Sequence, residues 1–478
     1  MKKSKIISSL LYKTIERLGV KGFGLLISVV LARMLSPHVF GEIAIITVFI
    51  NLSQTMNQSG LNTALVQKKN PSEVDYSTVF YITLALSFVF FGLIFVLAPF
   101  ISDYYGDPAL TLPLRVYAAT LIFSAFNSVQ IAKLQKEMRF KPMMTCNLIA
   151  TILSGALGII MAYSGAGLWA LIGYYMSNSI FASIAILFVE RWYPKLRVSM
   201  ESARELFSYG WKILVSGMVC SITADIRSLI IGKRYSTSSL GYYNRGQQFP
   251  EVISKTITYS VQSVMLPAMS DVQSETERLK QLLRKSAEIG SFIIIPAMFG
   301  LSAVAMPVVK VILSEKWLPC VAFMQYLSIA DACIPLMTSN LTVIKASGRS
   351  DIYMKLEFAR RAMIISILCI SVFCFRSVKA IAVGYCISSW LDCALIVLTV
   401  KGLLKIPVRE QFSWVWKTLL ASTVMMLVLL PMSRLQMPAI LLLALQLVAG
   451  VAIYFGLSVL LKNESVTMIM NMLRLKKK

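Results

Sequence analysis

The stretch TVFYITLALSFVFFGLIFVLAPFIS, residues 78–102, carries no charged side chain and has the length of one bilayer crossing. An α-helix needs about 20 mainly apolar residues to span the hydrocarbon core. The whole chain shares this character, since 57% of its 478 residues are hydrophobic and 15% are charged. A soluble protein has roughly 45–50% apolar and about 25% charged residues. The composition excludes a cytosolic enzyme, a disordered regulator and a secreted disulfide scaffold, and it predicts an all-α polytopic membrane protein.

About fourteen segments are apolar and long enough to be transmembrane helices. They lie near residues 15–35, 41–66, 78–102, 110–132, 143–163, 168–190, 211–232, 246–269, 288–313, 319–345, 356–375, 379–400, 414–433 and 438–461. If the N-terminus is inside, 34 of the 47 Lys and Arg residues lie on the cytoplasmic side, 9 lie outside and 4 lie within helices. The positive-inside rule then predicts that both termini are cytoplasmic.

The predicted topology explains the net charge of +24. The basic residues lie mostly in short segments between apolar runs, which is typical of contact with anionic lipid and not of a nucleic-acid groove. The connecting segments are too short for a catalytic domain. In residues 271–287, Ser274 and Glu277 have the spacing of a capping box. We expect them to begin a short helix whose Leu279, Leu282 and Leu283 lie along the membrane surface.

A weak internal repeat relates positions 200 residues apart. The segment from Ser28 to Gly41 aligns with the segment from Ser228 to Gly241, and each contains a basic residue, a polar turn and a final glycine. An even number of helices per repeat gives two halves of the same orientation. We therefore predict an N-terminal six-helix lobe (1–200), a C-terminal six-helix lobe (201–405), and two further helices with a basic cytoplasmic tail (406–478).

Polar residues recur on one face of the first, second and eighth predicted helices, and such faces usually meet a bundle interior or a watery cavity. With Arg227 of the seventh helix, the candidate substrate-binding residues are Arg17, Lys21, Asn51, Gln54, Gln58, Arg227, Gln248, Glu251 and Lys255. Cationic groups suit a phosphate or diphosphate, and amides suit sugar hydroxyls. Three alternatives remain open: the polar faces bond helix to helix, Glu251 and Lys255 form a merely structural pair, or Lys21 reaches the headgroups.

Three carboxylates within predicted helices, Asp225, Asp331 and Asp392, either couple transport to an ion or bond to neighbouring helices. Asp225 and Arg227 are two residues apart, so they point to nearly opposite sides, and the sequence does not decide which faces a cavity. The single histidine, His38, lies in a predicted external turn and is assigned no role. The eight cysteines form no C-x-x-C pair, so neither a metal site nor a cofactor is predicted.

Several motifs resemble bacterial polysaccharide transporter proteins, the Wzx-type flippases of the multidrug/oligosaccharidyl-lipid/polysaccharide exporter superfamily. The stretch L-A-R-M-L-S-P-x-x-F-G at residues 31–41 resembles the signature opening of this family. Further matches lie at residues 60–67, 165–174, 230–233, 240–250, 315–319 and 345–351. The resemblance covers about residues 1–400. It departs at Arg227, where related members tend to carry an acidic residue, and this leaves the roles of Arg227 and Asp225 open.

The resemblance implies a MATE-like, V-shaped bundle of two lobes in the bacterial inner membrane. It implies alternating access that carries undecaprenyl-diphosphate-linked oligosaccharides outward for O-antigen, capsule or exopolysaccharide assembly, without catalytic residues. The expected partners are this lipid-linked substrate, membrane lipids, and a polysaccharide polymerase with its chain-length and export machinery. The driving force is left open among ion coupling, membrane potential and removal of product.

Three other functions are weighed against this one. A drug exporter of the same superfamily would favour an apolar, acidic pocket, whereas the charges within these helices include basic ones. A membrane glycan polymerase or ligase would need a sizeable loop with catalytic groups, and the chain has one histidine and no D-x-D motif. A scaffold without transport activity would not need polar helix faces. The absence of a G-x-x-x-x-G-K-[ST] motif argues against direct use of ATP.

Overall fold

The computed structural model describes residues 3–58 and 60–463. The side chains of residues 3–18, 56–58, 209, 212, 213 and 350 fall outside that description, so the candidate residues Arg17 and Gln58 lie outside the described residues. The described residues form helices joined by short connections, with no strand among them. The chain divides into two compact units, Met1–Gly241 (unit 1) and Tyr242–Lys478 (unit 2). The predicted lobe boundary near residue 200 remains a prediction.

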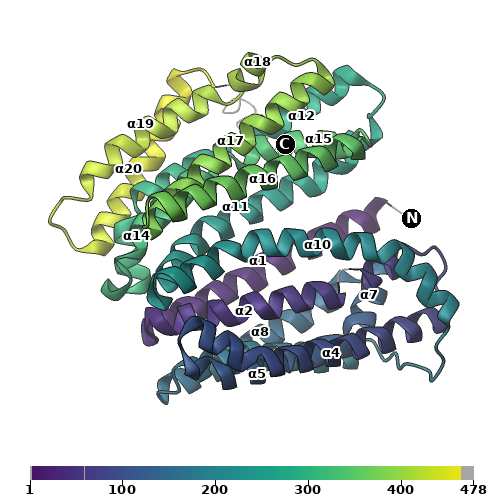
Figure 1. Ribbon diagram of the computed structural model, residues 1–478. Helices are drawn as coiled ribbons and strands as arrows, with labels where there is room; N and C mark the ends of the chain where they lie inside the picture. Colours follow the sequence, from purple (N-terminus) through teal and green to yellow (C-terminus); the bar gives the residue numbers. More distant parts are fainter. Residues whose placement is uncertain (1–2, 59, 464–478) are drawn as a thin grey trace. The chain divides into compact units, whose positions relative to one another are not determined.

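Unit 1 is built on long helices that pack side by side. Its elements are α1 (Lys3–Met34), α2 (Pro37–Gln58), α3 (Leu61–Gln67), α4 (Glu73–Tyr105), η1 (Pro108–Leu110), α5 (Thr111–Ala118), α6 (Thr120–Phe126), α7 (Ser128–Lys136), α8 (Phe140–Tyr163), α9 (Leu168–Val189) and α10 (Met200–Arg234). Helix α8 packs between α1 and α9, and α10 packs along α2, α3 and α4. Figure 1 shows α10 beside α2. The helix α11 (Thr237–Asp271) begins in unit 1 and continues into unit 2.

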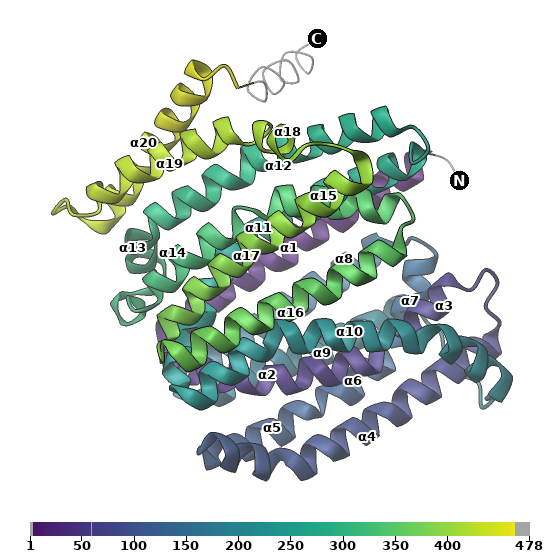
Figure 2. The ribbon, with the colours of Figure 1, turned by 45° about the horizontal axis from the view of Figure 1, so that its top comes forward.

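Unit 2 contains the remainder of α11 and the helices that follow it. They are α12 (Thr276–Ala303), α13 (Ala305–Val308), η2 (Val309–Leu313), η3 (Glu315–Trp317), α14 (Cys320–Asp331), α15 (Ile334–Ala346), α16 (Ser350–Cys374), α17 (Val378–Leu404), α18 (Val408–Ser413), α19 (Trp416–Met432) and α20 (Ala439–Leu460). Helix α17 packs against α14, α15 and α16, while α19 lies between α12 and α20 (Figure 2).

The membrane character of the helices agrees with the prediction of an all-α polytopic protein. Nine helical stretches within the described residues are long and apolar enough to cross a membrane. The other predicted spans coincide with α1, α2, α11, α16 and α19. The fold class is confirmed, and the number fourteen remains a prediction.

Two of the predicted spans are interrupted. The span at 41–66 is divided into α2 and α3, and the span at 110–132 is divided among short helices from η1 to α7. At the first interruption a β-carbon on Gly60 would lie 2.7 Å from the carbonyl oxygen of Gly210, so the start of α3 meets the α10 backbone directly. Small residues permit such close approach of two helices in a membrane.

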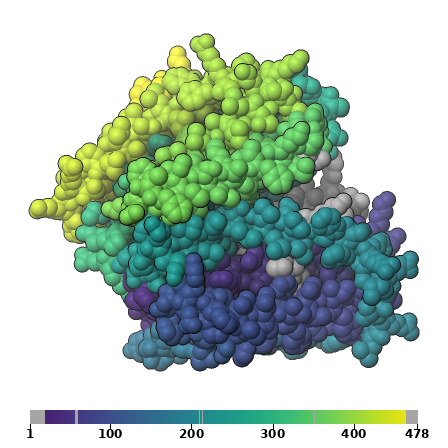
Figure 3. Space-filling model, in the orientation of Figure 1, coloured from purple at the N-terminus to yellow at the C-terminus, as the bar shows by residue number. Residues whose placement is uncertain are grey.

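Helix α4 shows how local sequence sets the ends of a span. Ser72 and Asp75 form a capping box, with the Asp75 N–H donating to Ser72 Oγ and the Ser72 N–H donating to the Asp75 carboxylate. Gly106 ends the helix at a φ of 72°, a left-handed conformation that glycine adopts without strain. Between these ends large apolar side chains are exposed, among them Val96 and Phe100, and Figure 3 shows this dark-blue surface of unit 1. These residues suit contact with lipid.

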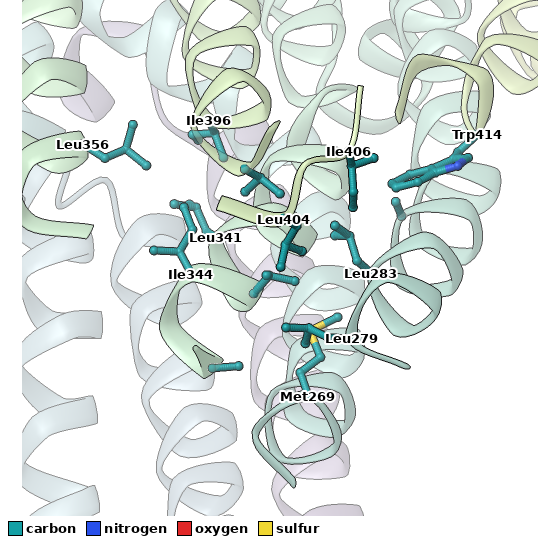
Figure 4. Close-up of a cluster of buried hydrophobic side chains, with 14 of the residues drawn as sticks. Met269, Leu279, Leu283, Leu341, Ile344, Leu356, Ile396, Leu404, Ile406 and Trp414 are labelled. Carbon is teal, nitrogen blue, oxygen red and sulfur yellow. The ribbon is translucent and has the colours of Figure 1, made fainter. Parts of the chain in front are cut away.

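The predicted capping box at Ser274 and Glu277 is wrong. The N-cap of α12 is Glu275, which has no side-chain capping bond, and α12 continues without a break to Ala303. The predicted surface position of the leucines is also wrong, because Leu279 and Leu283 are buried and Leu282 packs beside them. Figure 4 shows Leu279 and Leu283 in a core of unit 2 with side chains of α15 and α17. Packing against neighbouring helices removes this apolar side from the surface.

The turn at the start of α2 crosses the turn at the start of α11 with no space for side chains. A β-carbon on Gly41 would lie 1.8 Å from the carbonyl oxygen of Thr237, and one on Gly241 would lie 2.0 Å from that of Pro37. The two contacts correspond to each other, because Gly41 and Gly241, and likewise Pro37 and Thr237, are 200 residues apart. A two-fold relation between the two segments of the predicted repeat would require this. Glycine at both positions is therefore explained by backbone contact.

Candidate functional site

The candidate cation of α1, Lys21, is exposed. The packed side of α1 is defined by Gly19, against Leu148 of α8, and by Ile27, against Gly155 of α8. On a helix with 3.6 residues per turn, Lys21 lies on the side away from both. Within the described part of the chain, no ion pair joins the exposed Lys21 to another residue.

The amide face of α2 is divided between exposure and helix contacts. Asn51 is exposed and Gln54 is half-buried. The neighbouring Thr55 hydroxyl lies 3.0 Å from the Ser221 hydroxyl of α10, which ties this end of α2 to α10. Both expected roles are therefore present on this face of α2. Thr55 bonds to a neighbouring helix, and Asn51 presents its amide outside the packed interior.

Burial does not show which of Asp225 and Arg227, two residues apart on α10, faces a cavity. Asp225 and Arg227 are both half-buried, and each has an interaction partner in the structure. Because α10 packs along α2, α3 and α4, the two opposite sides on which these residues lie are both partly covered. Neither side chain is distinguished by burial alone, so both stay candidates.

Helix α11 separates its polar groups by side. Glu251 and Lys255 form an ion pair one turn apart, with 37% and 60% of their side chains exposed. Ser254, in the same turn, is fully buried and donates to the Asp331 carboxylate of α14 at 2.7 Å. Gln248 accepts a hydrogen bond from the buried Arg245, whose guanidinium lies 5.3 Å from the centre of the Trp317 ring. Thus α11 has an exposed charged side and a packed polar side.

Two of the three carboxylates proposed for ion coupling are held by other side chains of unit 2. Asp331 is buried and accepts the hydrogen bond from Ser254. Asp392 of α17 is also buried, and its carboxylate accepts a hydrogen bond from the Arg360 guanidinium of α16 at 2.8 Å. Arg360 also pairs with Glu357 one turn earlier. Both aspartates therefore bond to neighbouring helices, which was the alternative to ion coupling.

Sequence reasoning missed Arg360, which lies inside the predicted span 356–375, and Arg245, which lies just before the predicted span 246–269. The signal available for Arg360 was its position in the predicted span 356–375, where an arginine requires an acidic partner. It also missed an ionic junction in unit 1, where Lys68 bonds to Asp75 at 3.0 Å and to Glu205 of α10 at 2.7 Å. The hydrogen bond to Glu205 raises the pKa of Lys68.

Comparison with known sequences identifies relatives in surface-polysaccharide pathways. The family described as "Polysaccharide biosynthesis protein" matches residues 30–322. The succinoglycan biosynthesis transport protein ExoT of Rhizobium meliloti is 21% identical over 341 residues, covering 71% of this chain and 69% of ExoT. The lipopolysaccharide biosynthesis protein WzxC of Escherichia coli is 22% identical over 355 residues, covering 74% of this chain and 72% of WzxC.

Among solved structures, the lipid II flippase MurJ in an inward closed conformation has a similar fold. The TM-score is 0.79 with 14% sequence identity, and the match covers 95% of this chain and 99% of the MurJ chain. This likeness confirms the predicted MATE-like helical fold, and at this identity it speaks to the fold alone.

Proposed function

Because this chain belongs to the polysaccharide biosynthesis protein family, we propose that it is a flippase for undecaprenyl-diphosphate-linked oligosaccharide repeat units. The observation that carries the proposal is the family match over residues 30–322, together with relatives named for polysaccharide transport and lipopolysaccharide biosynthesis. The flippase fold of MurJ agrees with it. The glycan would serve O-antigen, capsule or exopolysaccharide assembly.

In this proposal the exposed cations recognise the diphosphate. Lys21 of unit 1 and Lys255 of unit 2 each present an ammonium group outside the packed interior of their own unit. An ammonium donating to a phosphate oxygen makes a charge-assisted hydrogen bond, which is shorter and stronger than a neutral one. Glu251 holds Lys255 until the substrate arrives, so binding exchanges one anionic partner for another.

The amides of Asn51 and Gln54 would contact the sugars, because an amide can both donate to and accept from a hydroxyl. Arg17 and Gln58 are assigned to the same helix faces by sequence, and Arg227 and Gln248 complete the proposed set. No bond is made or broken. Translocation requires only that the substrate bind differently to two states of the protein.

We place the protein in the bacterial inner membrane with both termini in the cytoplasm, following the positive-inside rule. The nine candidate spans support the multi-pass part of this assignment. A polymerase and its chain-length and export machinery would consume the translocated unit, and their removal of product is one of three candidate driving forces. Ion coupling through Asp225, Asp331 or Asp392 is the second, and the membrane potential is the third.

A drug exporter of the same superfamily is the alternative, and the two functions predict different ligands. An exporter of cations needs exposed acidic groups, whereas Asp331 and Asp392 are buried and bonded, and Lys21 is exposed. The charges that are open to a ligand therefore favour an anion.

The experiment is deletion of the gene followed by extraction and mass analysis of lipid-linked intermediates. The leaflet of any accumulated intermediate is assigned with a membrane-impermeant glycosidase. We expect complete repeat units on undecaprenyl diphosphate, trapped on the cytoplasmic face, and loss of surface polysaccharide. Translocated but unpolymerised units would instead indicate a polymerase, and an unchanged glycan profile would contradict the proposal and favour the exporter.

A further inference from the structure

A second cluster of chemically active side chains lies in unit 1, apart from the residues proposed to bind substrate. His38 and Glu42 are one turn apart at the start of α2, and Asp107 is the N-cap of η1 directly after α4. One ligand atom of each residue lies within 4.8 Å of the others. The chain has no other histidine.

The charges within this cluster do not balance. Glu42 is 7% exposed, and within the described residues its ion pair is with His38, whose Nδ1 lies 3.5 Å from Glu42 Oε2. An imidazole carries at most one positive charge, whereas two carboxylates carry two negative charges. Two carboxylates that share a partly buried site repel each other when both are ionised, and either a shared proton or a bound cation removes this repulsion. A divalent cation between them would offset the charge that the imidazole leaves unbalanced.

One of the three candidate ligands, Asp107, is held by a backbone group outside the cluster. The Ala109 N–H donates to Asp107 Oδ1 at 3.2 Å, which fixes the plane of that carboxylate. Such bonds from a second layer of groups set the direction in which a ligand presents its remaining lone pairs. His38 has 52% of its side chain exposed, so an ion can enter from solvent.

We infer that His38, Glu42 and Asp107 bind one divalent transition-metal cation, with Zn²⁺ as the representative ion. A nitrogen ligand disfavours Ca²⁺ and Mg²⁺, which prefer oxygen, and favours zinc and its neighbours. Three protein ligands with an open fourth position are common for zinc. The ion would join the start of α2 to the connection between α4 and η1, and the positive-inside rule predicts that this end faces outward.

The test uses the purified full-length protein in detergent, without a polyhistidine tag. Thiols are first blocked with N-ethylmaleimide, because eight cysteines are free and Cys220, Cys369 and Cys374 are exposed. After treatment with EDTA and desalting, Zn²⁺ is titrated by calorimetry and by thermal unfolding. We expect one Zn²⁺ per chain and a rise of about 2 °C or more in the unfolding midpoint, since a ligand that binds only the folded state stabilises it. Co²⁺ should give a spectrum without a thiolate band.

Substitutions identify the site. His38→Gln and Asp107→Asn should each weaken Zn²⁺ binding more than about tenfold. Asp103→Asn is the matched control, since Asp103 is an exposed aspartate on the neighbouring last turn of α4 outside the cluster, and it should bind as the parent does. No stoichiometric binding to the parent, or equal binding to the His38→Gln variant, would overturn the inference. The readout is binding, so its failure is distinguishable from failure of the flippase proposal.

Discussion

Two ion pairs in the helices of unit 2 each join a basic and an acidic side chain but lie in opposite environments. Arg360 and Asp392 join α16 to α17 with 12% and 6% of their side chains exposed, whereas Lys255 and Glu251 lie on one helix with 60% and 37% exposed. A buried pair leaves an uncompensated charge when one partner is removed. An exposed pair contributes little to stability and can exchange partners. Burial thus distinguishes a pair that holds the fold from one that can meet a ligand.

The largest effect is expected from Arg360→Ala. This change leaves the buried carboxylate of Asp392 without its guanidinium and should lower the free energy of unfolding by about 3–5 kcal/mol. The measurement is the midpoint of thermal unfolding in detergent, together with the amount of protein in membranes.

The matched control is Arg361→Ala, which removes a neighbouring arginine but leaves the Arg360–Asp392 pair intact. Arg361 lies 3.4 Å from Glu357 and is more exposed than Arg360, so its loss should cost much less. Equal midpoints for Arg360→Ala and the parent would show that the buried pair does not hold α16 to α17.

An intermediate effect, on transport and not on folding, is expected from Lys255→Ala. Because Lys255 is exposed, the free energy of unfolding should change by less than about 1 kcal/mol. Loss of one charge-assisted hydrogen bond to a diphosphate corresponds to roughly 1.5–3 kcal/mol, or about tenfold or more in binding. Surface polysaccharide should therefore fall while the amount of protein stays normal.

Lys21→Ala tests the same idea in unit 1, and Lys285→Ala, an exposed lysine of α12 outside the proposed set, is the control for both. Lys255→Arg should retain most activity because it keeps the charge. Normal glycan in both alanine variants and in their combination would remove the exposed cations from the mechanism.

The smallest effect is expected from Asp351→Asn. Asp351, in the first turn of α16, accepts a hydrogen bond at 2.9 Å from Arg349, the N-cap of that helix, and this bond lowers the pKa of Asp351 to about 2. A depressed pKa gives a stabilising contribution that is present above the ordinary pKa of 3.8 and is lost as the pH falls towards 2. At pH 7 the variant should unfold within about 1 °C of the parent, because fully solvated pairs contribute little. A much larger decrease at pH 7 would mean that exposure is a poor guide to the role of a pair in this protein.

Local patterns in the sequence were enough to predict the helical fold, the Glu251–Lys255 pair, and nine spans that match helical stretches of the described residues. Each of these depends on neighbours in the chain, on apolar length or on a spacing of one helical turn. The bond between Arg360 and Asp392 depends on how α16 and α17 align, which no local pattern encodes. The cluster of His38 with Glu42 and Asp107 was missed for the same reason, since Asp107 comes from a distant segment. The buried Leu279 and Leu283 were misassigned because an amphipathic pattern does not say whether protein or membrane covers its apolar side.

The central claim is that this protein moves a lipid-linked diphosphate sugar between leaflets. The most direct measurement reconstitutes the purified protein into liposomes that contain a labelled undecaprenyl-diphosphate oligosaccharide, and follows the label accessible to an added glycosidase. Protein-free liposomes should protect the label of the inner leaflet. We expect the parent protein to make this protected pool accessible and the Lys21→Ala, Lys255→Ala double variant to do so much more slowly. Protection equal to that of protein-free liposomes, with and without a membrane potential or ion gradient, would contradict the central claim.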